Sequence, residues 1–151
     1  FKRFLSEGKE AALRWASVNG HLEVVKLLLD GGADVHFWDD NSLKLASVTG
    51  HLEVVKVLLA AGADVHADGD WALRFASNNG HLEVVKVLLE GGADVHADGD
   101  LALWWACSNG HSEVAKLLES YGASLDRQPK QKVTLELTDE QLEKIKALLS
   151  E

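Results

Sequence analysis

The chain has 151 residues, of which 46% are hydrophobic and 26% are charged, a composition typical of a soluble protein that buries a sizeable core. Its formal net charge of −9 makes nucleic-acid binding unfavourable, because a phosphate backbone attracts a basic surface. The single cysteine, Cys107, excludes an internal disulfide framework and indicates a cytoplasmic, reducing location or recombinant production. We also expect no membrane span and no secretory signal, since no apolar run approaches spanning length.

The dominant feature of the chain is a pair of phrases that recur every 30 residues. Gly-His-Leu-Glu-Val-Val-Lys occurs at 20–26, 50–56 and 80–86, with a looser copy at 110–116. Gly-Ala-Asp-Val-His occurs at 32–36, 62–66 and 92–96, with a looser match at 122–126. A fixed period of this length predicts one supersecondary unit stacked several times in a row. We therefore expect one domain over residues 1–126, made of an N-terminal cap and four units at 7–36, 37–66, 67–96 and 97–126.

Each unit is predicted to form two short helices, as residues 67–96 illustrate. Residues 67–70 (Ala-Asp-Gly-Asp) form a turn, and residues 72–77 form a first helix whose small side chains allow a neighbour to approach closely. Gly80 ends this helix. The second helix carries leucine and valine at spacings of three and four, at positions 82, 85, 88 and 89. Because helices this short are marginal alone, stacking of their apolar sides must stabilise them.

The phrases Gly-His-Leu-Glu-Val-Val-Lys-x-Leu-Leu and Gly-Ala-Asp-Val resemble ankyrin repeats over residues 7–126. The resemblance implies an all-α solenoid of helix-turn-helix units. The period is 30 residues, whereas ankyrin repeats have about 33, and the missing residues fall where that family carries a protruding β-hairpin. Shortened finger loops are therefore expected. The wording Ala-Leu-Arg-Trp-Ala-Ser at 12–17 looks like the short ankyrin repeats of giant DNA viruses, and the near-identity of the units indicates recent duplication or an engineered binder.

Positions that differ between the units are free of the stacking role, and they gather in the turn and the first helix. In the ankyrin fold that the resemblance implies, these places line the concave side that faces a partner. Large apolar residues stand there where sister units carry small or polar ones, which predicts an interface patch across units two to four. The predicted partner-binding residues are Phe37, Trp38, Asn41, Trp71, Asn78, Leu101 and Trp104. The alternative for the aromatic members is local packing over the short turns.

Trp15 and Trp105 are interpreted differently from the other tryptophans. They occupy a place that is apolar in every unit, where the sister units carry Leu45 and Phe75. Constant apolar character at helical spacing is typical of a core position, so we expect both side chains in the core.

No pattern in the chain predicts catalysis, a cofactor or a metal. The seven histidines step with the repeat, whereas zinc ligands converge on one centre, so we interpret them as hydrogen-bonding groups of turns and caps. The acidic turns at 68–70 and 98–100 lack the six or more oxygens of a calcium site. Cys107 stands where the other units have serine and is predicted to be a small buried residue. We therefore expect no enzyme.

Residues 127–151 break the repeat. Residues 127–132 are predicted to form a polar linker that holds the only proline, and residues 133–137 alternate apolar and polar side chains like a strand. A helix is predicted to follow, with one apolar side made by Leu142, Ile145, Leu148 and Leu149. This strand and helix resemble the first half of a ribbon-helix-helix protein, a family in which the strand pairs with its twin and meets DNA. Residues 133–151 are expected to cap the last unit or to form a homodimer through residues 133–137.

The sequence thus predicts a non-catalytic scaffold that binds a protein partner on the variable turn and first-helix side of the units. The alternative is assembly of a homo-oligomer through the C-terminal strand and helix. A weaker third hypothesis is a DNA-associated factor that uses the same tail, against which the outward Glu136 argues.

Overall fold

The computed structural model describes residues 2–127 together with positions 143 and 147. The first helices of the four units are α1 (Lys2–Val18), α3 (Phe37–Thr49), α5 (Ala67–Asn78) and α7 (Ala97–Ser108). The second helices are α2 (Leu22–Asp30), α4 (Leu52–Ala60), α6 (Leu82–Glu90) and α8 (Ser112–Ser120), and a 3₁₀ helix, η1 (Leu125–Arg127), follows. The strand at 133–137 and the capping, dimer and DNA hypotheses attached to it lie outside the described residues and stay predictions.

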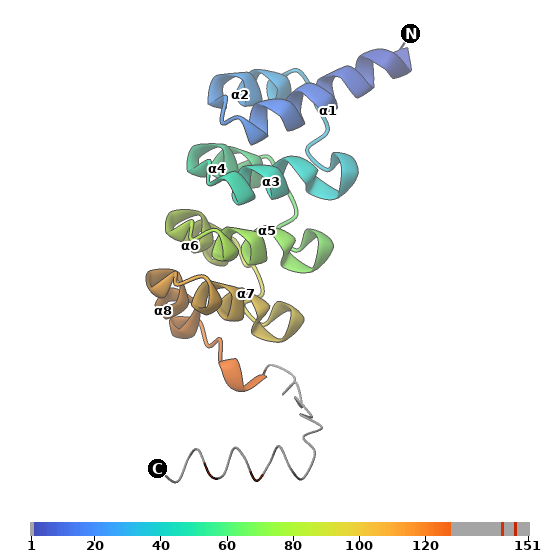
Figure 1. Ribbon diagram of the computed structural model, residues 1–151. Coiled ribbons are helices and arrows are strands. Elements are labelled where there is room, and N and C mark those ends of the chain that lie inside the picture. The colour runs from blue at the N-terminus through green and yellow to red at the C-terminus, as the bar shows by residue number, and fades with distance from the viewer. Residues whose placement is uncertain (1, 128–142, 144–146, 148–151) are drawn as a thin grey trace.

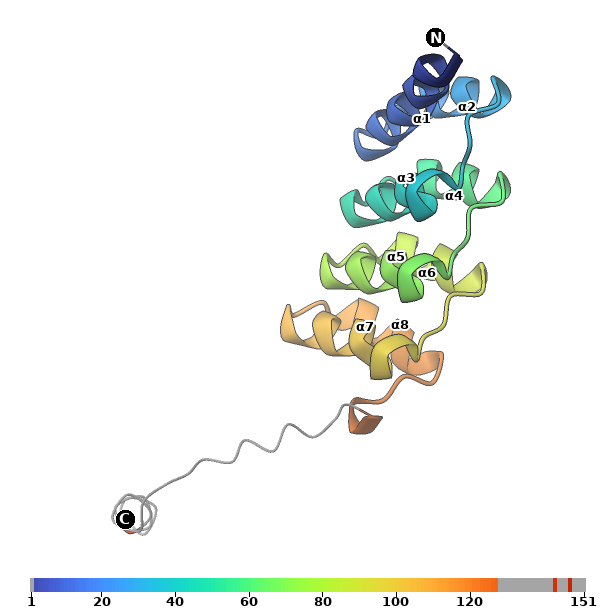
Figure 2. The ribbon, with the colours of Figure 1, turned by 90° about the vertical axis from the view of Figure 1, so that its right-hand side faces the viewer.

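The helix pairs stack on one another in a single column (Figure 1). The first helices lie side by side in one layer, and the second helices form another layer beside it, as Figure 2 shows from the side. Within residues 2–127 there is no strand. The predicted all-α solenoid of helix-turn-helix units is therefore confirmed. No helix in the described part of the chain has the length and apolar character needed to cross a membrane.

Leucine and alanine fill the space between the stacked pairs. Each first helix buries one leucine almost completely, and the second helices α4, α6 and α8 do the same; these residues are Leu13, Leu43, Leu73, Leu103, Leu58, Leu88 and Leu118. An alanine three residues after each first-helix leucine is also fully buried, at positions 16, 46, 76 and 106. Its small side chain lets neighbouring first helices approach closely. Each unit therefore contributes the same few side chains to one continuous core.

The shortened finger that the 30-residue period predicts is a single left-handed turn of backbone. In unit three, Asp68, Gly69 and Asp70 have φ values of 56°, 63° and 56°. The same three positions of α3 and α7 also have positive φ. Aspartate tolerates this region better than most residues that carry a Cβ, which is consistent with the Asp-Gly-Asp wording. The sequence predicted a short loop here but not its handedness.

Histidine ties each helix pair to the preceding one. The Nε2 nitrogens of His51, His81 and His111 each lie 3.0 Å from a backbone carbonyl oxygen near the end of the preceding first helix. Because a carbonyl can only accept, Nε2 carries the proton and donates it. These carbonyls have no partner within their own helix, so the histidines satisfy groups that a helix end leaves open. The sequence predicted hydrogen bonding in turns and caps, but not that this series bonds across units.

Candidate functional site

One side of each first helix faces away from the core. In α5, Trp71, Arg74, Phe75 and Asn78 are half-buried, whereas the residues between them are buried. Their spacing of three and four residues places them on one side of the helix. We call this surface, with its equivalents in the other units, the first-helix face. Its members are Ala11, Arg14, Trp15, Val18, Asn41, Lys44, Leu45, Val48, Trp71, Arg74, Phe75, Asn78, Leu101, Trp104, Trp105 and Ser108.

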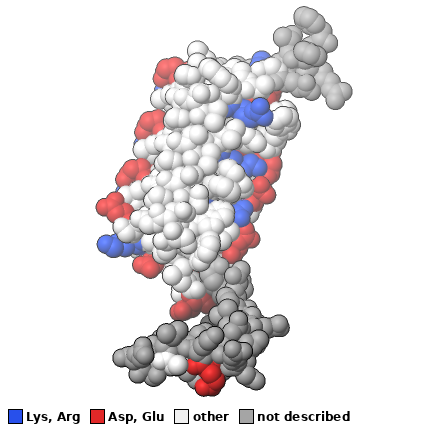
Figure 3. Space-filling model, viewed as in Figure 1, with Lys and Arg blue, Asp and Glu red and all other residues white. Residues whose placement is uncertain are grey.

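The front of the molecule carries an uncharged band along the length of the stack. Figure 3 shows this band with acidic and basic side chains along its two sides. A protein interface typically has this arrangement, with a core depleted of charge and a polar rim.

Three aromatic side chains of units three and four are in contact on the first-helix face. The Trp71 and Phe75 rings stack with their centroids 3.9 Å apart, and the Trp105 ring meets Phe75 edge-on at 5.0 Å. Trp104, next to this cluster in sequence, is 47% exposed. The cluster therefore joins one predicted site residue, Trp71, to Phe75 and Trp105, which occupy the position interpreted as core from the sequence.

The prediction that Trp15 is a core residue is wrong. Trp15 is 57% exposed and stacks on the His21 imidazole, with ring centroids 4.8 Å apart. Trp105, predicted in the same way, is only half-buried. The core is formed by the opposite side of the helix, where Leu13 and Ala16 lie. The constant apolar character of this position thus reflects an apolar stripe along the outer surface. Because a constant apolar position is also typical of a core, the sequence alone did not distinguish this stripe from the core.

The finger of unit two carries the two remaining aromatic site residues. The Phe37 and Trp38 rings stack with centroids 5.1 Å apart, and Trp38 is 61% exposed. The Arg14 guanidinium lies over the Trp38 ring, 5.0 Å from its centroid. This contact brings a residue of α1 to the finger of the following unit, and it is a cation–π arrangement.

The other predicted site residues are half-buried and polar or aliphatic. Asn78 accepts a hydrogen bond at Oδ1 from Asn109 Nδ2, 3.0 Å away. Asn41 Oδ1 is buried and has no hydrogen-bond partner among the described residues. Leu101 begins the outward side of α7 at the position of Trp71 in α5.

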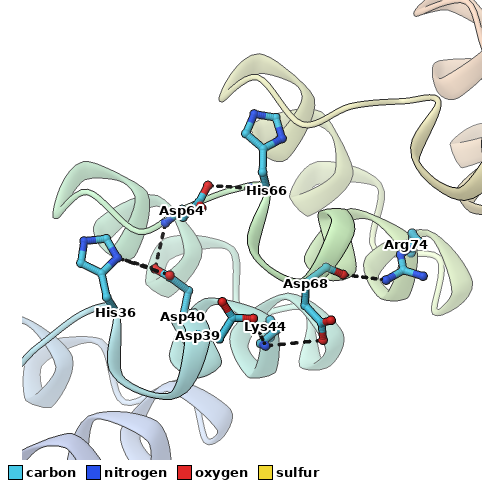
Figure 4. Close-up of polar contacts among 8 residues, drawn as sticks. All are labelled: His36, Asp39, Asp40, Lys44, Asp64, His66, Asp68 and Arg74. Atoms are coloured by element: carbon cyan, nitrogen blue, oxygen red, sulfur yellow. Dashed lines mark hydrogen bonds and ion pairs between the residues drawn. The ribbon is translucent and has the colours of Figure 1, made fainter.

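Two basic residues of the first-helix face, Lys44 and Arg74, make ion pairs inside the stack. Lys44 Nζ lies 3.2 Å from Asp39 of its own finger and 3.7 Å from Asp68 of the next finger. Arg74 donates to the Asp68 carbonyl oxygen at 2.8 Å and forms an ion pair with Asp98 of the next finger. Figure 4 shows Lys44 and Arg74 on either side of Asp68. These two side chains are only 11% and 13% exposed. Although the residue at this position varies between units, Lys44 and Arg74 are therefore not accessible to a partner.

A row of buried carboxylates, which sequence reasoning missed, holds each finger in place. Asp40, Asp70 and Asp100 are almost fully buried. Asp40 Oδ1 accepts from the Asp64 backbone N–H at 2.8 Å, and His36 Nδ1 lies 3.1 Å from the same oxygen (Figure 4). The Asp70 and Asp100 carboxylates repeat both contacts, and Glu10 takes the backbone contact in unit one. The signal in the sequence was an acidic residue at a constant place in every unit.

These acidic and imidazole groups do not gather around a common centre. Within the described part of the chain, no group of three or more His, Cys, Asp or Glu side chains could hold a metal ion.

Cys107 is exposed, so its prediction as a buried residue is wrong. The equivalent serines of the first three units are fully buried, because a following unit covers them. Cys107 lies in the fourth unit, where the described chain has no following helix pair. Partial burial raises the pKa of its thiol above the ordinary value, and the nearby Glu119 carboxylate raises it further. The thiolate, which is the reactive form, is thereby disfavoured at neutral pH.

The family comparison agrees with this architecture. No curated protein matches the chain. A family model described as ankyrin repeats in three copies matches residues 2–69 and 43–129. Together these two matches span the whole helical stack, and the chain therefore belongs to the ankyrin repeat family.

Proposed function

We propose that this protein is a non-catalytic scaffold that binds a protein partner through its first-helix face and the finger of unit two. Ankyrin repeats generally mediate protein–protein interactions, which supports the class of function. The proposal for the surface depends on one observation: large aromatic side chains are exposed on this side of the stack. Trp15, Trp38 and Trp104 are 57%, 61% and 47% exposed. Tryptophan is enriched among residues that dominate binding energy.

The arrangement of these side chains supports the proposal. The exposed tryptophans come from units one, two and four, so a partner that touches all three must lie along the stack rather than across one unit. The band without charged residues is free of the desolvation cost of burying charge, and the acidic and basic side chains beside it supply a polar rim (Figure 3). Neither the exposed tryptophans nor the band is needed for the core, which the leucine and alanine rows fill.

The test is capture of a partner by the intact chain and by matched variants. Replacing Trp38, Trp71 and Trp104 together by alanine should abolish capture, because truncating such anchors costs about 2 kcal/mol or more each. Leu27→Ala is the control, since Leu27 is 71% exposed but lies on α2, away from the first-helix face. Thermal unfolding of every variant separates loss of binding from loss of fold. Undiminished capture by the folded triple variant would refute the proposed surface.

A further inference from the structure

The second outward position of each of the first three units, held by Arg14, Lys44 and Arg74, lies next to the finger of the following unit. In units two and three this position holds a base, and the finger supplies a carboxylate: Lys44 meets Asp68, and Arg74 meets Asp98. Two successive junctions therefore use the same pairing of base and acid, which Figure 4 shows for Lys44.

The first junction keeps the base but lacks the acid. Trp38 stands at the place of Asp68 and Asp98, and Arg14 has its guanidinium over the indole instead of beside a carboxylate. Among the described residues, Arg14 has no ion-pair partner and donates no hydrogen bond to any acceptor. A guanidinium has five N–H donors, and an indole face offers it no hydrogen-bond acceptor. Arg14 is thus a half-buried cation without a hydrogen-bond acceptor among the residues that the structure describes.

This unpaired cation lines a hollow. Ala11, Arg14, Phe37 and Trp38 surround a volume of about 340 Å³. Two stacked aromatic rings form one part of its wall, and the guanidinium forms another. Among its described lining residues, the hollow combines an apolar surface with one positive group, a combination that suits a ligand with one negative end and one apolar end.

We propose that this hollow binds an acidic side chain of the protein partner, an Asp or Glu that follows or precedes an apolar residue. The inference rests on the proposed function and names the chemistry of one contact in it. The carboxylate would form paired hydrogen bonds with Arg14, a geometry that guanidinium and carboxylate share, while the apolar neighbour packs on Phe37 and Trp38. The other two junctions show which anion this position accepts, since both use a carboxylate. A polyanion such as nucleic acid fits less well, because the chain carries a net charge of −9.

The experiment uses a small probe, so it does not depend on the identity of the partner. Binding of 3-phenylpropionate to the intact chain is measured by ligand-observed NMR and compared with that of its neutral amide. A ligand of this size is expected to bind with a Kd on the order of 1 mM. The amide should bind at least about tenfold more weakly, because it cannot replace the missing carboxylate.

Three variants locate the contact. Trp38→Asp restores the acid found in the other fingers, and its short side chain suits the positive φ of 52° at this position, so the fold should persist while the probe is excluded. Arg14→Gln should weaken binding at least about tenfold. Arg74→Gln is the matched control, since Arg74 already pairs with Asp98, and it should leave the affinity unchanged.

The inference is overturned by any of three results: equal affinity for acid and amide, unchanged binding by Trp38→Asp, or no detectable binding of the acid at about 20 mM, well above the expected Kd. Failure here is distinct from failure of the proposed function. A chain that captures its partner through the first-helix face but ignores the probe loses only this inference. A chain that binds the probe but captures a partner independently of the triple tryptophan replacement loses the proposed surface and the partner's use of this hollow, while the carboxylate affinity of the hollow stands.

Discussion

At the scale of single residues, a glycine and a histidine determine how closely successive units can stack. A Cβ added to Gly20, Gly50 or Gly80 would lie 2.5 Å from Nδ1 of the histidine in the next unit, far below a normal contact distance. That imidazole cannot move aside freely, because its Nε2 donates to the preceding unit. Gly110 has the same backbone conformation but no atom within 4 Å of the added Cβ.

This difference predicts unequal effects of the same substitution. Gly110→Ala, at φ +77°, should cost about 1 kcal/mol for the left-handed backbone alone. Gly80→Ala, at φ +75°, should lose roughly 1–3 kcal/mol more, because the His111 hydrogen bond to Asn78 must break. Urea unfolding of both variants measures the difference. Equal losses would mean that the histidine adapts and that its bond across units contributes nothing.

The finger of unit two contains a second residue-scale contrast. Asp39 has a φ of 57° where units three and four have glycine. Asp39→Gly should raise the free energy of unfolding by roughly 0.5–1 kcal/mol, because the left-handed region costs glycine almost nothing. The substitution also removes the ion pair with Lys44, which contributes at most a fraction of that, because the Asp39 side chain is 65% exposed. The reciprocal change, Gly69→Asp at φ 63°, is the control and should lower the urea midpoint. A lower midpoint for Asp39→Gly contradicts the argument.

At the scale of the element, the finger is held by its buried carboxylate rather than by strand pairing. The Asp70 carboxylate accepts from the Asp94 backbone N–H at 2.7 Å and from His66 Nδ1 at 3.1 Å. One side chain thus fixes both the left-handed turn and the segment that enters the next unit. A hairpin finger needs cross-strand hydrogen bonds for the same purpose, and this shorter finger replaces them with side-chain bonds.

Two aspartates of one finger test this account. Asp70→Ala should cost about 2–3 kcal/mol, because it leaves the Asp94 N–H without its acceptor and removes a charge-assisted bond. Asp68→Ala should cost at most about 1 kcal/mol, since the Asp68 side chain is 59% exposed and makes an ion pair at 3.7 Å. Both residues have a φ of 56°, so the backbone effect of alanine is the same in each. Thermal and urea unfolding compare them, and similar losses would contradict a special role for the buried carboxylate.

The length of the finger could be predicted from the sequence, but its handedness and the carboxylate that holds it could not. The three residues missing from each period predicted a short finger, because the number of residues in a loop can be counted in the sequence. The left-handed turn was not foreseen, since Asp-Gly-Asp is compatible with several turn types. The role of Asp70 was missed for a related reason: aspartate is usually exposed, and its burial depends on an N–H that lies 24 residues further along the chain.

At the scale of the whole molecule, the stack could be predicted because each unit repeats the same contacts. The 30-residue period fixed which helices are neighbours, and the buried leucine rows follow from it. The period could not say which side of a first helix faces solvent. The positions of Leu13 and Trp15 both hold an apolar residue in every unit, so periodicity alone did not indicate which of the two belongs to the core. For the candidate site, sequence variation found Trp38 and Trp104 but not Trp15, whose position varies only among apolar residues.

The N-terminal end of the stack and its interior provide the last prediction, because a repeat array is stabilised by contacts between neighbours. Val54, Val84 and Val114 are 1–2% exposed, whereas Val24 at the same position of α2 is 42% exposed, since in the described part of the chain no second helix packs against this side of α2. Val84→Ala should therefore cost about 2 kcal/mol, the transfer energy of two methyl groups plus the cavity left behind. Val24→Ala should cost less than about 1 kcal/mol, because much of its surface is already in water. Urea unfolding at two protein concentrations measures both. A large, concentration-dependent loss of unfolding free energy for Val24→Ala would contradict this expectation. It would show that this end of the stack is covered in solution, as by a second copy of the chain at the place of a preceding unit.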